Sequence, residues 1–206
     1  SSDLKDDIFK KYNIPTDKKI VALTMRPHRF PKSNTPKEDY ITFKSEIALF
    51  IKWLYSKGFM PLLIEHTFAI NNHENDGACI EEVIQLLEKD EYRVFSNKDF
   101  TCYELKSVYS YCDYIVGTRF HSVIFSISNN VPGIAITYAG NKGEGIMNDI
   151  GIENLTISID DVSCKSLQNK FTFLLDNEKS VVEKISNYNI MASKKRIQLI
   201  KSIKRN

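Results

Sequence analysis

The sequence lacks the features that mark membrane-spanning, secreted or metal-binding chains. No apolar run approaches the roughly 18 to 20 residues needed to cross a bilayer, and the charged start SSDLKDD has no apolar signal-peptide region. The four cysteines fall in no CxxC or CxxH spacing, which argues against a zinc site and against a disulfide framework. These absences predict a cytoplasmic protein with reduced cysteines and no transmembrane segment.

An excess of charge of one sign is also absent. The 28 basic and 26 acidic residues leave a formal net charge of +2, which does not point to a nucleic-acid-binding protein. The 206 residues are 42% hydrophobic, enough to bury a core. We therefore expect a folded domain whose partner is a small molecule rather than a nucleic acid.

Short apolar runs alternate with longer amphipathic segments along the whole chain. This pattern is typical of βα units and a parallel sheet. It predicts one α/β domain over residues 1–206, doubly wound, mainly parallel and Rossmann-like, with a basic helical tail over 178–206. The expected strands cover 19–25, 59–67, 92–96, 114–117, 133–138 and 154–160.

Local signals refine this outline. The polar segment 71–77 predicts an exposed loop, and Thr101 with Glu104 has the spacing of a capping box. Thr118 is the expected N-cap of the helix after the fourth strand. The buried stripe of that helix is expected to run through Phe120, Val123, Ile124 and Ile127.

Arg119 and His121 fall in the first turn of this helix, off the expected stripe. Free backbone N–H groups and the helix dipole favour an anion there, so a cation at this position predicts a bound phosphate or carboxylate. A purely structural interpretation is equally open: Arg119 pairs with a nearby acid, and His121 is a satisfied interior histidine. A position off the stripe predicts that folding survives substitution of either residue, whereas a collapsed fold would support the structural interpretation.

Two further strand ends carry cations. The first strand runs into MRPHRF, which brings Arg26 to the same edge of the sheet. The fifth runs into TYAGNKGEG, where Lys142 follows glycines that allow backbone to approach a ligand. Parallel sheets bind ligands at the carboxyl ends of their strands, so these cations favour an anionic ligand at that edge.

The segment TRFHSVIFSISNNVPGIAITYAGNKGEGIMNDIGI resembles the carboxyl-terminal signature of the polysaccharide pyruvyl transferase family. The resemblance rests on Arg, an apolar residue and His, on Val-Pro before a strand, on Tyr followed by Lys, and on Asp before Ile-Gly-Ile. It spans about 35 residues of the 206. The earlier strands, with an arginine at the end of the first, are similar to that family without sharp motifs.

This resemblance implies a two-domain, GT-B-like architecture, of which the chain would be the carboxyl-terminal half, lacking the amino-terminal domain. It also implies transfer of pyruvate from phosphoenolpyruvate to two hydroxyls of a glycan or lipid-linked sugar, forming a ketal without a cofactor or metal. Arg119, Phe120 and His121 match an Arg-Leu-His motif tied to donor binding and catalysis, with Phe120 in place of leucine.

The resemblance suggests roles for other residues at this edge. Arg26 or Lys142 would be the second clamp on the donor, and His121 would act as acid or as base. Tyr138 could stack on a ring or simply pack, and Glu144 could bind a sugar or remain a surface carboxylate. Ordinary structural or surface roles are the leading interpretation for His66 and His73.

The basic tail admits two interpretations. It lacks acids over 193–206 and could favour an anionic glycan or a lipid-linked precursor at the inner face of the membrane. A solvated helical face would explain the same composition.

Two other functions fit the same pattern. A nucleotide-sugar glycosyltransferase or epimerase half-domain would bind UDP at these strand ends, with Glu144 on the ribose and Arg119 on the diphosphate. A non-catalytic α/β ligand-binding module is the second. A receiver domain is disfavoured because the first strand ends in Met25, Arg26 and Pro27, not in the acids that hold magnesium.

Overall fold

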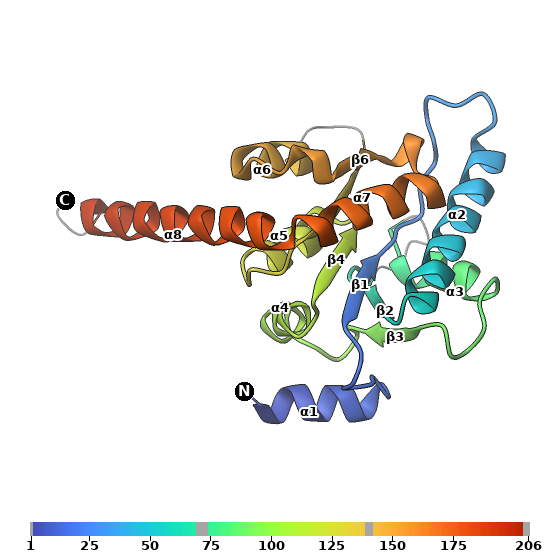
Figure 1. Cartoon of the computed structure of the whole chain (residues 1–206), viewed down its shortest axis with the longest axis horizontal. Coiled ribbons are helices and arrows are strands. Elements are labelled where there is room, and N and C mark those ends of the chain that lie inside the picture. Colours follow the sequence, from blue (N-terminus) through green and yellow to red (C-terminus); the bar gives the residue numbers. More distant parts are fainter. Residues whose placement is uncertain (1, 69–73, 139–141, 204–206) are drawn as a thin grey trace.

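The computed structural model describes residues 2–68, 74–138 and 142–203. Its centre is a six-stranded sheet in the order β3-β2-β1-β4-β5-β6, in which every neighbouring pair is parallel (Figure 1). The strands are β1 (Ile20–Thr24), β2 (Met60–Glu65), β3 (Arg93–Ser96), β4 (Tyr114–Gly117), β5 (Gly133–Thr137) and β6 (Thr156–Ser158). This arrangement confirms the predicted Rossmann-like fold.

The order of the strands reverses between β1 and β4. The chain first builds outward from β1 to β3, then returns to the other side of β1 and builds outward to β6. Ligands of doubly wound sheets bind beyond the carboxyl ends of the strands at this reversal. The topology therefore directs attention to the residues that follow Thr24 and Gly117, which are paired in register.

Helices connect the strands and cover both faces of the sheet (Figure 1). They are α1 (Ser2–Lys11), α2 (Pro36–Ser56), α3 (Asp76–Ile84), α4 (Cys102–Ser110), α5 (Phe120–Ile127), α6 (Lys142–Ile150), α7 (Cys164–Asp176) and α8 (Glu178–Ile203), with short 3₁₀ turns η1 (Glu153–Leu155) and η2 (Ile159–Asp161). Helix α1 was not predicted, because its apolar residues are few and its sequence is highly charged.

Side chains of β1 alternate between two hydrophobic clusters. Val21 and Leu23 join the cluster that includes residues of α2, α3 and α7, whereas Ile20 and Ala22 join the one that includes residues of α1 and α4. All five β1 residues are buried, which is typical of a central strand covered on both faces. The sheet thus holds the strand ends rigidly.

The predicted capping box is confirmed, and the predicted loop is partly wrong. The capping box is present, since Glu104 N donates to Thr101 Oγ1 at 3.3 Å and Thr101 N donates to Glu104 Oε2 at 2.8 Å. Helix α2 ends at Ser56, and Gly58 just beyond it adopts a φ of +89° that favours glycine.

The prediction of an exposed loop over 71–77 is wrong for the last residues of that segment. Residues 71–73, including His73, lie outside the described residues. Helix α3 already begins at Asp76, and Asn75 caps it by accepting a hydrogen bond from Gly77 N at 3.0 Å. The polar composition that indicated a loop belongs partly to a helix start, where Asn and Asp are equally favoured.

Helix α8 begins against the body of the domain and extends well beyond it (Figure 1). Val181 and Ile185 are buried, while Ile190, Met191 and Ile197 are at least half exposed. In the described part of the chain, no helix combines the length and the apolar character needed to cross a membrane.

Candidate functional site

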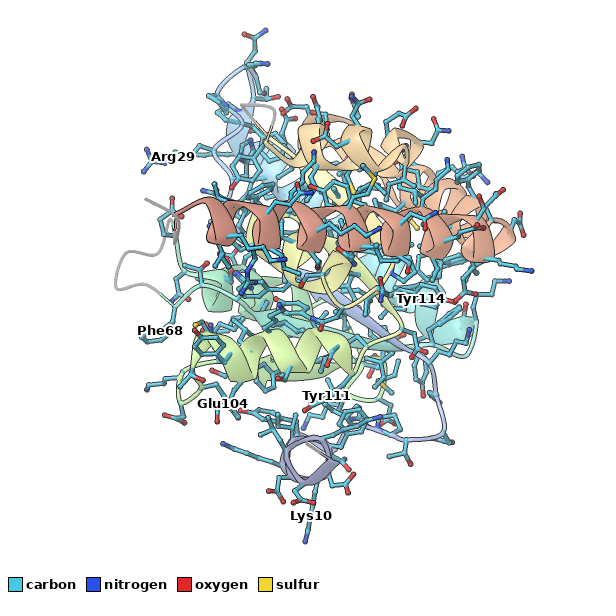
Figure 2. All side chains as sticks on the ribbon, turned by 90° about the vertical axis from the view of Figure 1, so that its left-hand side faces the viewer. Lys10, Arg29, Phe68, Glu104, Tyr111 and Tyr114 are labelled. Atoms are coloured by element: carbon cyan, nitrogen blue, oxygen red, sulfur yellow. The ribbon has the colours of Figure 1, made fainter. Side chains whose placement is uncertain are left out.

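Cationic side chains meet where β1 and β4 end. Arg26 lies two residues beyond β1 and Arg119 two residues beyond β4, and these are the strands on either side of the topological reversal. Figure 2 shows Arg29 and Phe68, which follow β1 and β2, at the left-hand side, and Tyr114, the first residue of β4, toward the right. The candidate site is therefore at the carboxyl edge of the sheet, as predicted from the sequence.

The turn from β4 into α5 is packed tightly against β1. A Cβ atom at Gly117 would lie 2.8 Å from Ser122 Oγ, so glycine is what lets the helix approach this closely. Ser122 Oγ donates to Arg119 O at 2.6 Å and lies 2.8 Å from Thr24 Oγ1. These buried hydrogen bonds fix the backbone of Arg119 relative to β1.

Arg119, not Thr118, is the N-cap of α5. Thr118 is buried and donates its hydroxyl to Thr24 O at 3.1 Å, so it bridges two strand ends instead of capping the helix. The helix has no side-chain cap, because the cap position is occupied by a residue whose guanidinium points to other partners. The N-terminal N–H groups of α5 thus have no side-chain acceptor at the cap.

The guanidinium of Arg119 is paired with a buried carboxylate. Its Nε and Nη2 donate to Asp76 Oδ1 at 2.9 and 2.6 Å, and Asp76 Oδ2 accepts from Thr67 N at 2.9 Å. Asp76 is fully buried and Arg119 is 9% exposed. The pairing with a nearby acid that was one of the two interpretations of Arg119 is therefore present.

Burial raises the pKa of Asp76 to about 6, while the bonds from Arg119 and Thr67 act in the opposite direction. The carboxylate is still ionised at neutral pH. A buried pair of this kind is costly to break, because removing one partner leaves the other charge without compensation.

Glu74 joins the two arginines. Its Oε2 accepts from Arg119 Nη1 at 3.1 Å and its Oε1 accepts from Arg26 Nη2 at 3.2 Å. The bond from Arg119, together with the charge of Arg26, holds the pKa of Glu74 below its usual range. Its side chain is 52% exposed, whereas those of Arg26 and Arg119 are only 14% and 10% exposed. An acidic bridge thus covers two cations that are largely withdrawn from solvent.

A groove of about 750 Å³ opens beside this bridge, and its lining includes Arg26, Arg29, Lys37, Glu74 and Tyr138. A volume of this size is within the range of small-molecule sites. The Arg26 guanidinium lies 4.3 Å from the centre of the Tyr138 ring, which is a cation–π contact. Tyr138 is half-buried, so one use of its ring is to position Arg26.

His121 is exposed, in the first turn of α5. It is therefore not the interior histidine of the structural alternative. Its ring centre lies 5.6 Å from that of Phe120 and 6.4 Å from that of Phe125. The predicted stripe of α5 is confirmed at Val123 and Ile127, which are buried, whereas Phe120 and Ile124 are only half-buried. Ser122 and Ser126 complete the buried side of the helix.

His66 makes a structural contact, as its leading interpretation from the sequence implies. It directly follows β2, and its Nδ1 lies 2.8 Å from the Tyr109 hydroxyl. Burial lowers its pKa to about 4, helped by the positive charges of Arg119 and His121. His66 is thus a neutral imidazole at neutral pH. The place of His66 at the end of β2 could be predicted from the sequence, but its partner Tyr109, 43 residues away, could not.

Glu144 and Lys142 both belong to α6. Glu144 is exposed and accepts from the Thr137 hydroxyl at 3.2 Å, so its carboxylate is tied to the end of β5. Lys142 is the first residue of α6, and its side chain lies outside the described residues. Within the described ranges, no three His, Cys, Asp or Glu side chains are grouped so as to hold a metal ion.

The family model described as polysaccharide pyruvyl transferase matches residues 6–140, about two thirds of the chain. The chain belongs to this family. The match begins in α1 and ends just after β5, and it includes Arg26, Arg119 and His121.

A similar curated protein is the amylovoran biosynthesis protein AmsJ of Erwinia amylovora. It is 25% identical over 194 residues, which are 90% of this chain and 45% of AmsJ. The chain therefore spans less than half the length of this relative.

One solved structure resembles the fold, and a second gives a weaker superposition. A glycosyltransferase from Rickettsia africae superposes with a TM-score of 0.52 and 13% identity, over 100% of this chain and 52% of that one. The glycosyltransferase SnogD from Streptomyces nogalater gives a TM-score of 0.44 and 13% identity, over 90% of this chain and 43% of its own. At these identities the likeness concerns the fold alone.

Proposed function

We propose that the chain contributes the donor-binding half of an enzyme that transfers pyruvate from phosphoenolpyruvate to two hydroxyls of a glycan sugar. The observation that carries this proposal is the meeting of Arg26 and Arg119 at the strand reversal, with His121 exposed in the adjoining helix turn, in a member of this family. Phosphoenolpyruvate carries about three negative charges, and arginines bind both phosphate and carboxylate through paired N–H groups.

The arginines divide into two roles. Arg119 presents Nη1 toward Glu74 while Asp76 holds its other edge, so one edge of the guanidinium is fixed and one is directed to the site. Arg26 presents Nη2 to the same carboxylate. One N–H group from each arginine thus bonds to the Glu74 carboxylate. A carboxylate or phosphate of the donor could be bound by the same two N–H groups.

His121 is the proposed acid/base residue. An imidazole can donate or accept a proton through its ring nitrogens, so His121 would protonate the methylene carbon of the donor or deprotonate the attacking hydroxyl. Protonation of the donor gives a cationic carbon, to which the first sugar hydroxyl adds. Breakage of the carbon–oxygen bond to phosphate and attack by the second hydroxyl then close the ketal. One hydroxyl proton replaces the proton delivered to the donor, and the other leaves with phosphate.

The acceptor would be a glycan or a lipid-linked sugar in the cytoplasm, held partly by a second domain facing this one, as in a GT-B-like enzyme. The chain covers 45% of AmsJ, a protein whose name places it in amylovoran biosynthesis, which supports a polysaccharide acceptor. On this proposal the chain alone binds the donor but does not complete the ketal.

Thermal unfolding in the presence of phosphoenolpyruvate, pyruvate and UDP tests the donor. Phosphoenolpyruvate at about a hundred times its Kd should add roughly 2.7 kcal/mol to the free energy of unfolding, and pyruvate should add much less. Stabilisation by UDP without stabilisation by phosphoenolpyruvate would instead favour a nucleotide-sugar enzyme.

A further inference from the structure

Glu74 and Asp76 are two residues apart, yet they contact the arginines in different ways. Asp76 is fully buried and accepts two bonds from Arg119 and one from Thr67 N. The Glu74 side chain is 52% exposed and touches Arg119 and Arg26 through one bond each. The Asp76 carboxylate is a fixed part of the domain, and the Glu74 carboxylate is held far less firmly.

The backbone of Glu74 is anchored independently of its side chain. Arg119 Nη2 donates to Glu74 O at 2.8 Å, so the position of the main chain does not depend on the carboxylate. Rotation about the side-chain bonds of Glu74 can therefore release both guanidiniums without moving the backbone. The exposed carboxylate loses little on release, because water replaces its partners.

The charges balance only with Glu74 in place. Arg26 and Arg119 are matched by Glu74 and Asp76, so no net charge remains for an incoming anion. With Glu74 turned away, one positive charge remains uncompensated, and both inward-facing N–H groups are open. The groove side is otherwise basic, since Glu74 is the one carboxylate among its described lining residues, which also include Arg26, Arg29 and Lys37.

We propose that the Glu74 carboxylate occupies the position of the ligand's anionic group, and that ligand binding exchanges it for a carboxylate or phosphate oxygen between Arg26 and Arg119. The identity of the ligand as phosphoenolpyruvate rests on the proposed function, whereas the exchange itself applies to any small phosphate or carboxylate. Glu74 keeps the two arginines together when no ligand is bound. A ligand must compete with its carboxylate, so a weakly charged ligand does not displace it.

Replacing Glu74 by Gln tests the exchange, because the amide keeps the size of the side chain and removes its charge. Calorimetric titration with phosphoenolpyruvate and, separately, with inorganic phosphate should give a Kd roughly three- to tenfold lower for E74Q than for the wild type, the range expected when the two part-exposed ion pairs of Glu74 no longer compete. Glu74→Ala should show the same direction. An unchanged or higher Kd for both probes in both variants would overturn the proposal.

Glu82→Gln is the matched control. Glu82 is 49% exposed and pairs with Lys44 at 2.7 Å, so the substitution removes an equally exposed carboxylate and changes the net charge by the same amount. Its Kd values should equal those of the wild type. Equal tightening in E82Q and E74Q would mean that only overall charge matters, which contradicts a local exchange.

The two probes separate this proposal from the proposed function. Tighter phosphate binding in E74Q, with no binding of phosphoenolpyruvate by any variant, supports the exchange and rejects the donor. Phosphoenolpyruvate binding of equal strength in wild type and E74Q retains the donor and rejects the exchange. Thermal unfolding of each variant without ligand checks that the fold is intact.

Discussion

The two edges of the sheet carry polar networks of different character. At the amino edge, Lys19 Nζ donates to the Tyr114 hydroxyl at 3.1 Å, and that hydroxyl donates to Glu178 Oε1 at 2.9 Å. The Lys19 and Glu178 side chains are 55% and 41% exposed. At the carboxyl edge, the arginines are 10% and 14% exposed and one of their acids is fully buried.

This difference distinguishes a structural network at the amino edge from the proposed binding site at the carboxyl edge. The amino-edge network ties the start of α8 to β1 and β4, with charges that water already stabilises. The carboxyl-edge network fixes cations away from water beside a groove, which is costly for folding unless the charges have partners. Partner exchange with a ligand is the use that such an arrangement permits.

Arg119→Ala should have the largest effect on stability. It leaves Asp76 buried without its partner, so we expect a loss of about 3 to 5 kcal/mol in the free energy of unfolding, measured with urea, along with loss of donor binding. This replaces the prediction from sequence that folding survives the substitution. The double variant Asp76→Asn, Arg119→Met should recover much of the lost stability, because no charge remains buried. A loss below about 1 kcal/mol in Arg119→Ala would mean that the Arg119–Asp76 pair contributes no more than an exposed ion pair.

His121→Ala should affect turnover and not folding. In the complete enzyme we expect turnover to fall by roughly 10² to 10⁴, the usual contribution of acid/base assistance, while donor binding by this chain stays nearly unchanged. The exposed imidazole has few packing contacts to lose. Phosphate release with a glycan acceptor measures the rate, and an undiminished rate would remove His121 from the mechanism.

His66→Asn should change how stability depends on pH. The folded-state pKa of His66 is about 4 and the ordinary value is 6.5, so its stabilising contribution is complete above pH 6.5 and is lost as the pH falls toward 4. The difference between wild type and variant should therefore shrink by up to about 3 kcal/mol from pH 7 to pH 4. Asp76, with a pKa near 6, titrates with the opposite sign in both proteins and cancels in this difference.

Urea unfolding at the two pH values makes this comparison. Asparagine keeps a polar atom near the position of Nδ1 for the Tyr109 hydroxyl, which limits other losses. A difference that does not vary with pH would mean that the imidazole is not held neutral by its surroundings.

Lys19→Ala at the amino edge should have the smallest effect. Its ammonium is more than half exposed, so a loss of at most about 1 kcal/mol in the free energy of unfolding is expected, with donor binding unchanged. High salt should abolish the difference from wild type. A loss as large as that of Arg119→Ala would show that the two edges do not differ as described.

The fold was accessible from the sequence because its strands are apolar runs and its helices have regular periodicity. The place of Arg26 and Arg119 followed from the same pattern, since parallel strands bring their carboxyl ends to one edge. The partner of Arg119 was not accessible. Asp76 is 43 residues away in the sequence, at a helix start whose polar residues also fit an exposed loop.

The predicted buried stripe of α5 was wrong at Phe120 and Ile124 for a different reason. Ser122 and Ser126 are fully buried although they are polar, because their hydroxyls donate to carbonyls of their own helix one turn earlier. Hydrophobic periodicity gives such residues no weight and shifts the stripe toward Phe120 and Ile124. A helix over most of the basic tail could be predicted without knowledge of buried partners, because helical periodicity depends only on residues that are close in the sequence.

The most direct test of the account is calorimetric titration of phosphoenolpyruvate into the wild type and into Arg26→Met. Among the described residues, the ion-pair partner of Arg26 is Glu74, whose side chain is 52% exposed, so the loss of Arg26 leaves no buried charge and should leave the unfolding free energy nearly unchanged. We predict binding by the wild type, at least roughly tenfold weaker binding by Arg26→Met as expected for a lost charge-assisted bond, and no binding of UDP by either. Equal binding of phosphoenolpyruvate by both proteins, or binding of UDP alone, would contradict the assignment of this edge as the donor site.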